Sequence, residues 1–126
     1  MRLERGLLNQ KMKKMKSMSN VIEKPWGHEV LWAHTDKYVG KILVIKEGHA
    51  LSRQFHIEKD ETILILDGEL LFEQDGDEKI LHPGEAAHIP PDTVHRMTAV
   101  SDCRIVEVST PELDDVVRLD DNYGRV

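Results

Sequence analysis

The chain has 126 residues, with 17 Lys plus Arg against 23 Asp plus Glu, giving a formal net charge of −6. This length is typical of one domain. The single cysteine, Cys103, excludes a disulfide framework and a thiolate zinc site. The apolar runs are much shorter than the roughly 20 residues that cross a bilayer, and the first residues lack the apolar stretch of a secretory signal. We therefore expect a cytoplasmic protein that makes no membrane contact.

The charge is divided unevenly along the chain. Residues 1–20 contain six basic side chains and one acidic side chain, whereas residues 21–126 contain 11 basic and 22 acidic side chains. We expect residues 1–20 to form a flexible basic leader and residues 21–126 to form one domain with an acidic C-terminal tail. The acidic body argues against nucleic-acid binding, because contacts to phosphates need a basic surface.

Short apolar runs separated by turn residues predict an all-β sandwich or barrel from Val21 onward. The predicted strands comprise residues 29–33, 38–45, 50–56, 61–66, 69–74, 79–81, 85–89, 95–99 and 104–108. Two-residue hairpin turns are predicted at Asp67-Gly68 and Asp75-Gly76, because a type I′ turn needs positive φ at both positions. No window between residues 21 and 110 has a sustained helical period, so we expect little helix there.

Four side chains in this pattern have the spacing of a metal site. Gln54 and His56 lie two apart in a predicted strand, so they project to the same face. Glu61 begins the next predicted strand, and antiparallel pairing of the two strands would bring it opposite that pair. With His95 as a fourth member, the set offers two imidazoles, a carboxylate and an amide oxygen. These are suitable ligands for a divalent transition metal.

The same residues carry a resemblance to a known family. The segment GHALSRQFHIEKDETILILDG, residues 48–68, resembles the first cupin motif, and GEAAHIPPDTVH, residues 84–95, resembles the second. Gln54 stands where the first motif usually has His, and Asp92 where the second usually has Gly. The resemblance implies a double-stranded β-helix, or jelly-roll barrel, with Gln54, His56, Glu61 and His95 as the metal ligands.

A ligand set that begins with Gln resembles that of mannose-6-phosphate isomerases. The chain is similar to the C-terminal cupin domain of the type II enzymes, which pair that isomerase with a mannose-1-phosphate guanylyltransferase domain. The supporting segments are KPWG at 24–27, IPP and TVHR within 89–96, and DNYGR at 121–125. No glycine-rich nucleotide loop occurs, so we expect no guanylyltransferase activity from these residues.

This resemblance implies a metal-dependent isomerase that converts mannose 6-phosphate to fructose 6-phosphate through an enediolate. We expect zinc as the metal, with manganese, iron, nickel and cobalt as alternatives. A divalent ion would stabilise the charge that develops on the two sugar oxygens.

Binding a sugar phosphate also requires cationic anchors. We predict catalytic or phosphate-binding roles for Arg125 and Arg96, because a guanidinium binds phosphate through two parallel hydrogen bonds. Weaker candidates for contact with the substrate are Lys41, Ser52, Arg53, His88 and Tyr123. In so acidic a body, a phosphorylated substrate requires these basic residues to gather at the barrel mouth. If Arg53, Arg96, Arg125 and Lys41 are scattered, a neutral sugar is the better expectation.

Two other function classes stay open at this point. One is a different cupin enzyme, such as a dioxygenase or a sugar epimerase; Gln54 counts against the oxygenase, which favours a histidine-rich ligand set. The other is a cupin without catalysis that binds a sugar or a metal. In each case the expected partner is a small sugar or sugar phosphate, and by analogy with small cupins we expect a homodimer.

Overall fold

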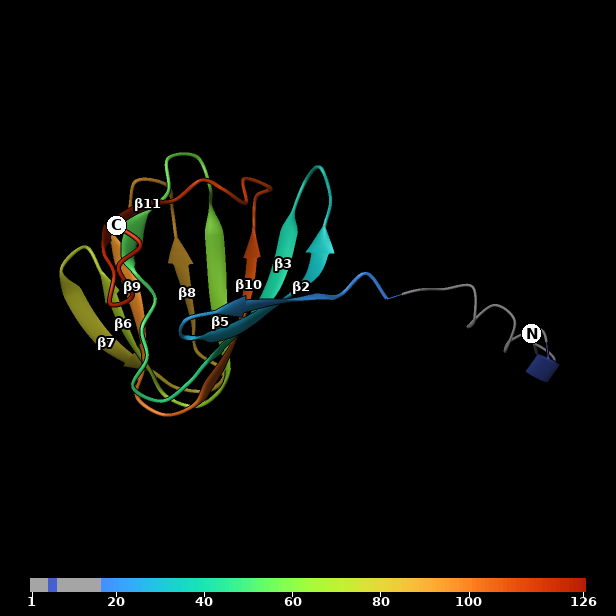
Figure 1. Cartoon of the computed structure of the whole chain (residues 1–126), viewed down its shortest axis with the longest axis horizontal. Helices are drawn as coiled ribbons and strands as arrows, with labels where there is room; N and C mark the ends of the chain where they lie inside the picture. Colours follow the sequence, from blue (N-terminus) through green and yellow to red (C-terminus); the bar gives the residue numbers. More distant parts are fainter. Residues whose placement is uncertain (1–4, 7–16) are drawn as a thin grey trace.

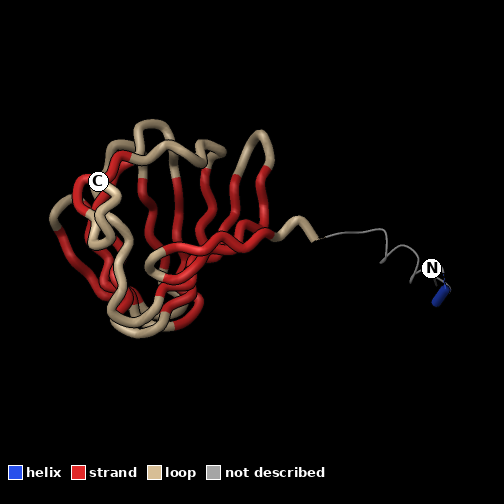
Figure 2. The backbone as a smooth tube through the Cα atoms, viewed as in Figure 1, coloured by secondary structure: helices blue, strands red, loops and turns tan. Residues whose placement is uncertain are grey.

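The structure is a computed structural model that describes residues 5–6 and 17–126. Most of the predicted basic leader, residues 1–4 and 7–16, lies outside the described residues. Between residues 17 and 126 the regular secondary structure is entirely strand (Figure 2). The strands are β1 (Asn20–Lys24), β2 (Gly27–His34), β3 (Val39–Ile45), β4 (Arg53–Phe55), β5 (Glu61–Asp67), β6 (Leu70–Gln74), β7 (Asp77–Leu81), β8 (Ala86–Ile89), β9 (His95–Ala99), β10 (Cys103–Ser109) and β11 (Val117–Asp120).

Two antiparallel sheets face each other across one interior (Figure 1). The six-stranded sheet has the order β1-β2-β3-β10-β5-β8, and the five-stranded sheet has the order β11-β4-β9-β6-β7. The predicted all-β, double-stranded β-helix is confirmed. The strands β1 and β11 were not predicted; β11 lies in the segment that we expected to be an acidic tail, and it pairs with β4 at the edge of the smaller sheet.

Alternation along the inner strands separates the interior into an apolar end and a polar end. In β5, Glu61, Ile63 and Ile65 are buried, and in β10 the same face continues from Ile105 to Glu107. Because every second residue of a strand points inward, the carboxylates at one end share a face with the isoleucines at the other. The apolar end is filled by Trp26, Leu43, Ile45, Leu51, Ile63, Ile65, Leu70, Phe72, Leu81, Ile89, Met97, Ala99, Cys103 and Ile105.

The two predicted hairpins have different outcomes. Asp75-Gly76 joins the paired strands β6 and β7, and both residues have positive φ, 51° and 85°. Asp67-Gly68 is not a hairpin, because β5 and β6 belong to different sheets. Gly68 has φ 82°, and a Cβ there would lie 2.2 Å from the carbonyl oxygen of Asp102. Glycine is therefore required at this corner for close backbone approach.

The predicted strand over residues 50–56 is also shorter than expected. Only Arg53–Phe55 forms β4, and Ala50 makes an isolated bridge to Thr98. The predicted pairing of this strand with the one that begins at Glu61 is wrong, because β4 and β5 lie in opposite sheets. The turn after His56 crosses from one sheet to the other, so His56 and Glu61 meet across the interior.

The outer face of the six-stranded sheet carries a row of apolar side chains in register, Val30, Ile42, Val106 and Leu64. Leu64 is 38% exposed. The expected homodimer stays a prediction, and this row is the first face on which to test it. Within the described part of the chain, no helix is long and apolar enough to cross a membrane.

Candidate metal centre

Three donor side chains converge at the polar end of the interior. Glu61 begins β5, His95 begins β9 and His56 follows β4, and all three are buried. Glu61 Oε1 lies 3.0 Å from His56 Nε2 and 3.3 Å from His95 Nε2. Their potential ligand atoms all lie within 4.8 Å of one another. The structure thus brings together three of the four predicted ligands from three strands in both sheets.

The two imidazoles are held with the same ring nitrogen facing the cluster. His95 Nδ1 lies 2.9 Å from the carbonyl oxygen of Thr93, and His56 Nδ1 is hydrogen-bonded to the carbonyl oxygen of Asp115. A ring nitrogen that faces a carbonyl must donate, which leaves the lone pair of the neutral imidazole on Nε2. This is the arrangement that metal-binding histidines use.

Gln54 stands beside this cluster. It pairs directly with His95 across β4 and β9, so their side chains lie on the same face of the sheet. Its Oε1 accepts a hydrogen bond of 2.7 Å from the hydroxyl of Ser52, which is itself buried. Because a carboxamide oxygen has two lone pairs, this bond leaves Gln54 able to act as a ligand. Ser52, which was predicted to contact the substrate, therefore fixes the orientation of the Gln54 amide through this hydrogen bond.

Charge at the cluster is balanced by a buried lysine and a second carboxyl group. Lys59 Nζ lies 3.4 Å from Glu61 Oε2 and 3.2 Å from Glu107 Oε2. Burial and the negative charge of Glu61 raise the pKa of Glu107 to about 8. Burial by itself would raise the pKa of Glu61, but its contacts with His56 and His95 and the positive charge of Lys59 hold that pKa well below the ordinary value. Glu61 is consequently the charged member of this pair of carboxyl groups.

The donor set fits a divalent cation. Two buried atoms of the cluster, Glu61 Oε2 and His95 Nε2, have no hydrogen-bond partner among the described residues. Buried polar atoms are normally satisfied, so such atoms within one cluster indicate a missing partner. An anionic carboxylate and two imidazole lone pairs accept a metal ion as that partner. The sequence analysis did not single out Lys59 or Glu107, which complete the electrostatics of the site.

Asp115 anchors the turn that carries His56. Its carboxylate accepts hydrogen bonds from the backbone N–H groups of Ile57, Glu58 and Lys59, at 3.0, 2.7 and 2.9 Å. These bonds hold the pKa of Asp115 below its ordinary value. The C-terminal segment thereby fixes the ring of His56, through the carbonyl of Asp115, and the turn that leads to Glu61.

Replacing Asp115 by alanine is expected to weaken zinc binding about 10-fold, since loss of groups that orient a metal ligand typically costs 10- to 100-fold. Competition with a chromophoric chelator measures this affinity. The exposed neighbour Asp114 supplies the control, and Asp114→Ala should bind zinc like the unmodified chain. Equal affinities for the two variants would remove Asp115 from the support of the site.

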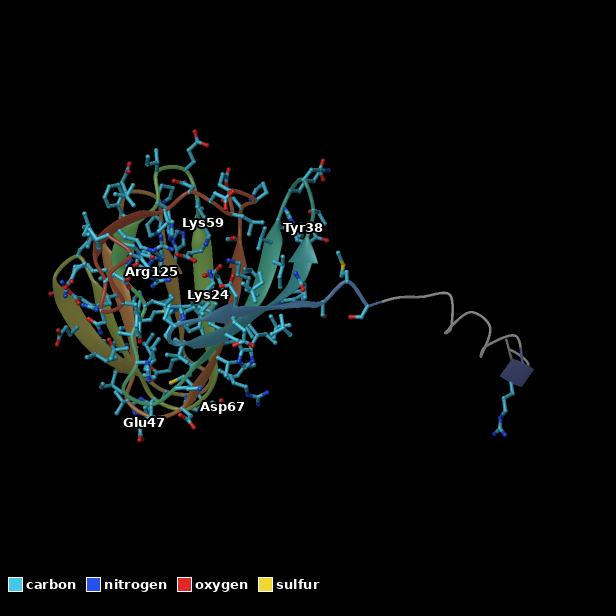
Figure 3. The ribbon with its side chains drawn as sticks, viewed as in Figure 1. Lys24, Tyr38, Glu47, Lys59, Asp67 and Arg125 are labelled. Carbon is cyan, nitrogen blue, oxygen red and sulfur yellow. The ribbon has the colours of Figure 1, made fainter. Side chains whose placement is uncertain are left out.

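A cavity opens beside the cluster and is lined by His56, Gln54, Ser52 and five cationic side chains, which are Lys24, Lys41, Lys59, Arg118 and Arg125. Figure 3 shows Lys24, Lys59 and Arg125 in one region of the barrel, whereas Glu47 and Asp67 lie at its other end. Glu29 and Glu107 are the carboxyl groups of the lining. A chain with an acidic body therefore has a cavity rich in positive charge.

Four of the predicted substrate residues lie outside this cavity lining: Arg53, Arg96, His88 and Tyr123. Arg53 binds both carboxylate oxygens of Glu73, and Arg96 is bonded to the carbonyl of Leu51 and to Asn122. Both arginines alternate with inward-facing residues of β4 and β9, so they lie on the outer face. His88 is exposed, with its Nε2 2.6 Å from Asp60 Oδ1. Of the four basic residues expected at the mouth, only Lys41 and Arg125 line the cavity, so the four do not gather there. The other cations of the lining are Lys24, Lys59 and Arg118.

The C-terminal segment, residues 121–125, holds Arg125 at the cavity. Tyr123 packs against the apolar core, its hydroxyl lies 2.7 Å from His49 Nδ1, and the Arg125 guanidinium stands 5.7 Å from the centre of its ring. Arg125 donates to both carboxylate oxygens of Asp121, from Nε and Nη2, each at 2.9 Å. Tyr123 and Asp121 therefore act on Arg125, and Tyr123 itself is not part of the lining.

This ion pair predicts a pH dependence of stability. Hydrogen bonds from Arg125 lower the pKa of Asp121 from 3.8 to about 2. A depressed pKa contributes stability that is present above pH 4 and lost as the pH falls towards 2. Because the guanidinium is partly exposed, we expect roughly 1 kcal/mol. Urea denaturation should show Asp121→Asn less stable than the unmodified chain at pH 6 but nearly equal at pH 2. An unchanged difference at both pH values would contradict this account, and the exposed Asp77→Asn is the control.

Comparison with known proteins identifies the family. Residues 41–109, which include all four metal-ligand candidates and most of both sheets, match the Cupin domain family. The chain belongs to the cupin family. The cupin resemblance that the two motifs indicated is therefore confirmed, together with the barrel fold.

Three similar proteins illustrate the range of this cupin's relatives. A mannose-1-phosphate guanylyltransferase of Escherichia coli (strain K12) is 34% identical over 110 residues, 83% of this chain and 23% of that enzyme. The chain thus spans about a quarter of that relative. Among solved structures, KdgF from Halomonas sp. has a TM-score of 0.68 at 21% identity, over 75% of this chain and 88% of that one. Pac13, a nucleoside dehydratase, has a TM-score of 0.72 at 14% identity, over 85% of this chain and 92% of that one. At these identities the two structures support the fold alone.

Proposed function

We propose that this cupin is a metal-dependent sugar-phosphate isomerase of the mannose-6-phosphate isomerase type. The observation that carries the proposal is a buried cluster of His56, Glu61 and His95 beside a cavity rich in cationic side chains. The relative from Escherichia coli is named for mannose 1-phosphate, which is a phosphorylated hexose. The Gln54 position in the ligand set supports the same class.

The metal is proposed to be zinc, held by His56, Glu61 and His95 with Gln54 as a fourth ligand. A bound divalent ion would supply Lewis acidity to the two sugar oxygens beside the carbon that loses its proton. The chain's own residues then have separate tasks. Ser52 orients Gln54, while Trp26 and Leu51 line the wall and limit water around the sugar. Lys59 and Glu107 line the cavity beside Glu61, so the wall contains groups that can exchange protons.

A neutral sugar is the second candidate substrate, and two observations favour it. The first is that Arg53 and Arg96 lie outside the cavity lining. The second is that the cations of the lining are mostly paired. Most cationic side chains of the cavity already contact a carboxylate, for example Lys41 with Glu29 at 3.4 Å. A paired cation attracts a second anion less strongly than a free one, because its charge is largely offset. The cavity lining thus supports a phosphate only if at least one cation is uncommitted.

The isomerase proposal is tested by an assay of the zinc-loaded chain that couples fructose 6-phosphate formation to a dehydrogenase. We expect turnover of mannose 6-phosphate that disappears on dialysis against a chelator and returns with zinc. Mannose in place of mannose 6-phosphate tests the neutral-sugar alternative in the same assay format. A zinc-loaded chain that turns over neither sugar would overturn the isomerase and favour a cupin that only binds its ligand.

A further inference from the structure

Arg118 is the cationic side chain of the cavity that has no partner among the described residues. It lines the cavity, and no hydrogen bond or ion pair joins its guanidinium to the described part of the chain. Its Nε is buried and unsatisfied. A buried guanidinium N–H without an acceptor is costly, so its position is explained best by an acceptor that a ligand supplies.

The other four cations of the cavity differ from Arg118 in this respect. Each already contacts a carboxylate: Lys24 and Lys41 share Glu29 at 3.9 and 3.4 Å, Lys59 contacts Glu61 at 3.4 Å, and Arg125 binds Asp121 at 2.9 Å. Their charges are therefore partly offset within the protein, with Lys24 and Lys41 sharing one carboxylate. Arg118 contributes positive charge that nothing in the described residues neutralises.

The position of Arg118 follows from the pairing of two edge strands. In β11 it stands directly opposite Gln54 of β4, so the two side chains lie on the same face of the sheet, with Cβ atoms about 5 Å apart. Gln54 in turn pairs with His95 of β9. The three residues form one row across the sheet, with the metal ligands at one end and the free guanidinium at the other.

We propose that Arg118 binds the phosphate group of a phosphorylated sugar while the sugar oxygens lie at the metal ligands. A guanidinium offers two parallel N–H donors that match two oxygens of a phosphate. This inference rests on the proposed function for the identity of the sugar, and it assigns the anion-binding role to Arg118 in place of Arg96 and Arg125. The β11 strand that carries Arg118 thereby becomes part of the substrate site.

The test measures binding without turnover. The zinc-loaded full chain is titrated by calorimetry with 2-deoxyglucose 6-phosphate, which cannot become a ketose because it lacks the C2 oxygen, and with 2-deoxyglucose. We expect the unmodified chain to prefer the phosphorylated sugar at least about 10-fold, a typical value for a charged hydrogen-bond pair. Arg118→Gln should abolish this preference and leave the affinity for 2-deoxyglucose unchanged.

Two further variants sharpen the result. Arg96→Gln changes an arginine on the outer face of β9 in the same sheet, and it should keep the full preference. Arg118→Lys retains the charge without the two parallel donors of the guanidinium, and its preference for the phosphorylated sugar should fall several-fold. This variant replaces Arg118→Gln in the test if Arg118→Gln fails to fold. No preference in the unmodified chain, or a preference that survives both Arg118 substitutions, would overturn the proposal.

The two proposals fail separately. Suppose that Arg118→Gln abolishes the preference for the phosphorylated sugar but the unmodified chain does not turn over mannose 6-phosphate. The anion site is then supported and the isomerase proposal is wrong. If mannose 6-phosphate is turned over and Arg118→Gln leaves both turnover and preference intact, the isomerase stands and the anion site falls.

Discussion

His95→Ala is expected to reduce bound zinc from one ion per chain to almost none, and to lower any isomerase activity by at least about 1,000-fold. His95 supplies one of two imidazole lone pairs to the cluster, and its Nδ1 is already held by the carbonyl of Thr93. Three-ligand and four-ligand zinc sites depend on each donor, and substitutions outside the ligand set already cost 10- to 100-fold. Elemental analysis after dialysis against zinc measures the first effect, and the coupled assay measures the second.

The matched control for this substitution is His34→Ala. His34 is an exposed histidine at the end of β2 and lies outside the cavity lining. The His34→Ala variant should retain one zinc ion per chain and full activity. Zinc bound equally by the two variants would mean that the metal is held elsewhere, and the assignment of the site would be wrong.

Lys59→Met is expected to destabilise the metal-free chain by about 3 kcal/mol, the largest effect on stability that we predict. Lys59 is 5% exposed and contacts both Glu61 and Glu107. Removing one partner of a buried ion pair leaves an uncompensated charge, which typically costs 3–5 kcal/mol. Urea denaturation at neutral pH measures the free energy of unfolding.

Two controls separate the loss of charge from the loss of packing. Lys46→Met changes an exposed lysine of the same length and should cost less than about 0.5 kcal/mol. Adding Glu61→Gln to Lys59→Met should recover part of the stability of the metal-free chain, because the buried charged carboxylate that lost its partner is then replaced by a neutral amide. A cost below 1 kcal/mol for Lys59→Met alone would contradict the buried charge network.

The sequence was sufficient to predict the barrel and the metal cluster because both depend on local patterns. Alternation predicted most of the strands, and the two motifs placed His56, Glu61 and His95 in one site. The same alternation could have identified Glu107, since it lies two residues beyond Ile105 on the inner face of β10.

Other features depend on pairings that no local pattern specifies. The strand β11 has only four residues and is half exposed, so its periodicity is weak, and Arg118 could not be placed from it. The partners of Arg53 and Arg96 lie 20 or more residues away in the chain, at Glu73 and Asp120. The sequence also does not specify the sheet to which β4 belongs. For this reason His56 and Glu61 were predicted to lie on paired strands, whereas they come together from opposite sheets.

The central claim is that a divalent metal ion binds where His56, Glu61 and His95 meet. Crystals of the zinc-treated chain, measured on both sides of the zinc absorption edge, test it directly. We expect one strong anomalous peak at about 2.0–2.2 Å from the Nε2 atoms of both histidines and from a Glu61 oxygen. An absence of any peak at this cluster after saturation with zinc, or a peak only elsewhere, would contradict the account.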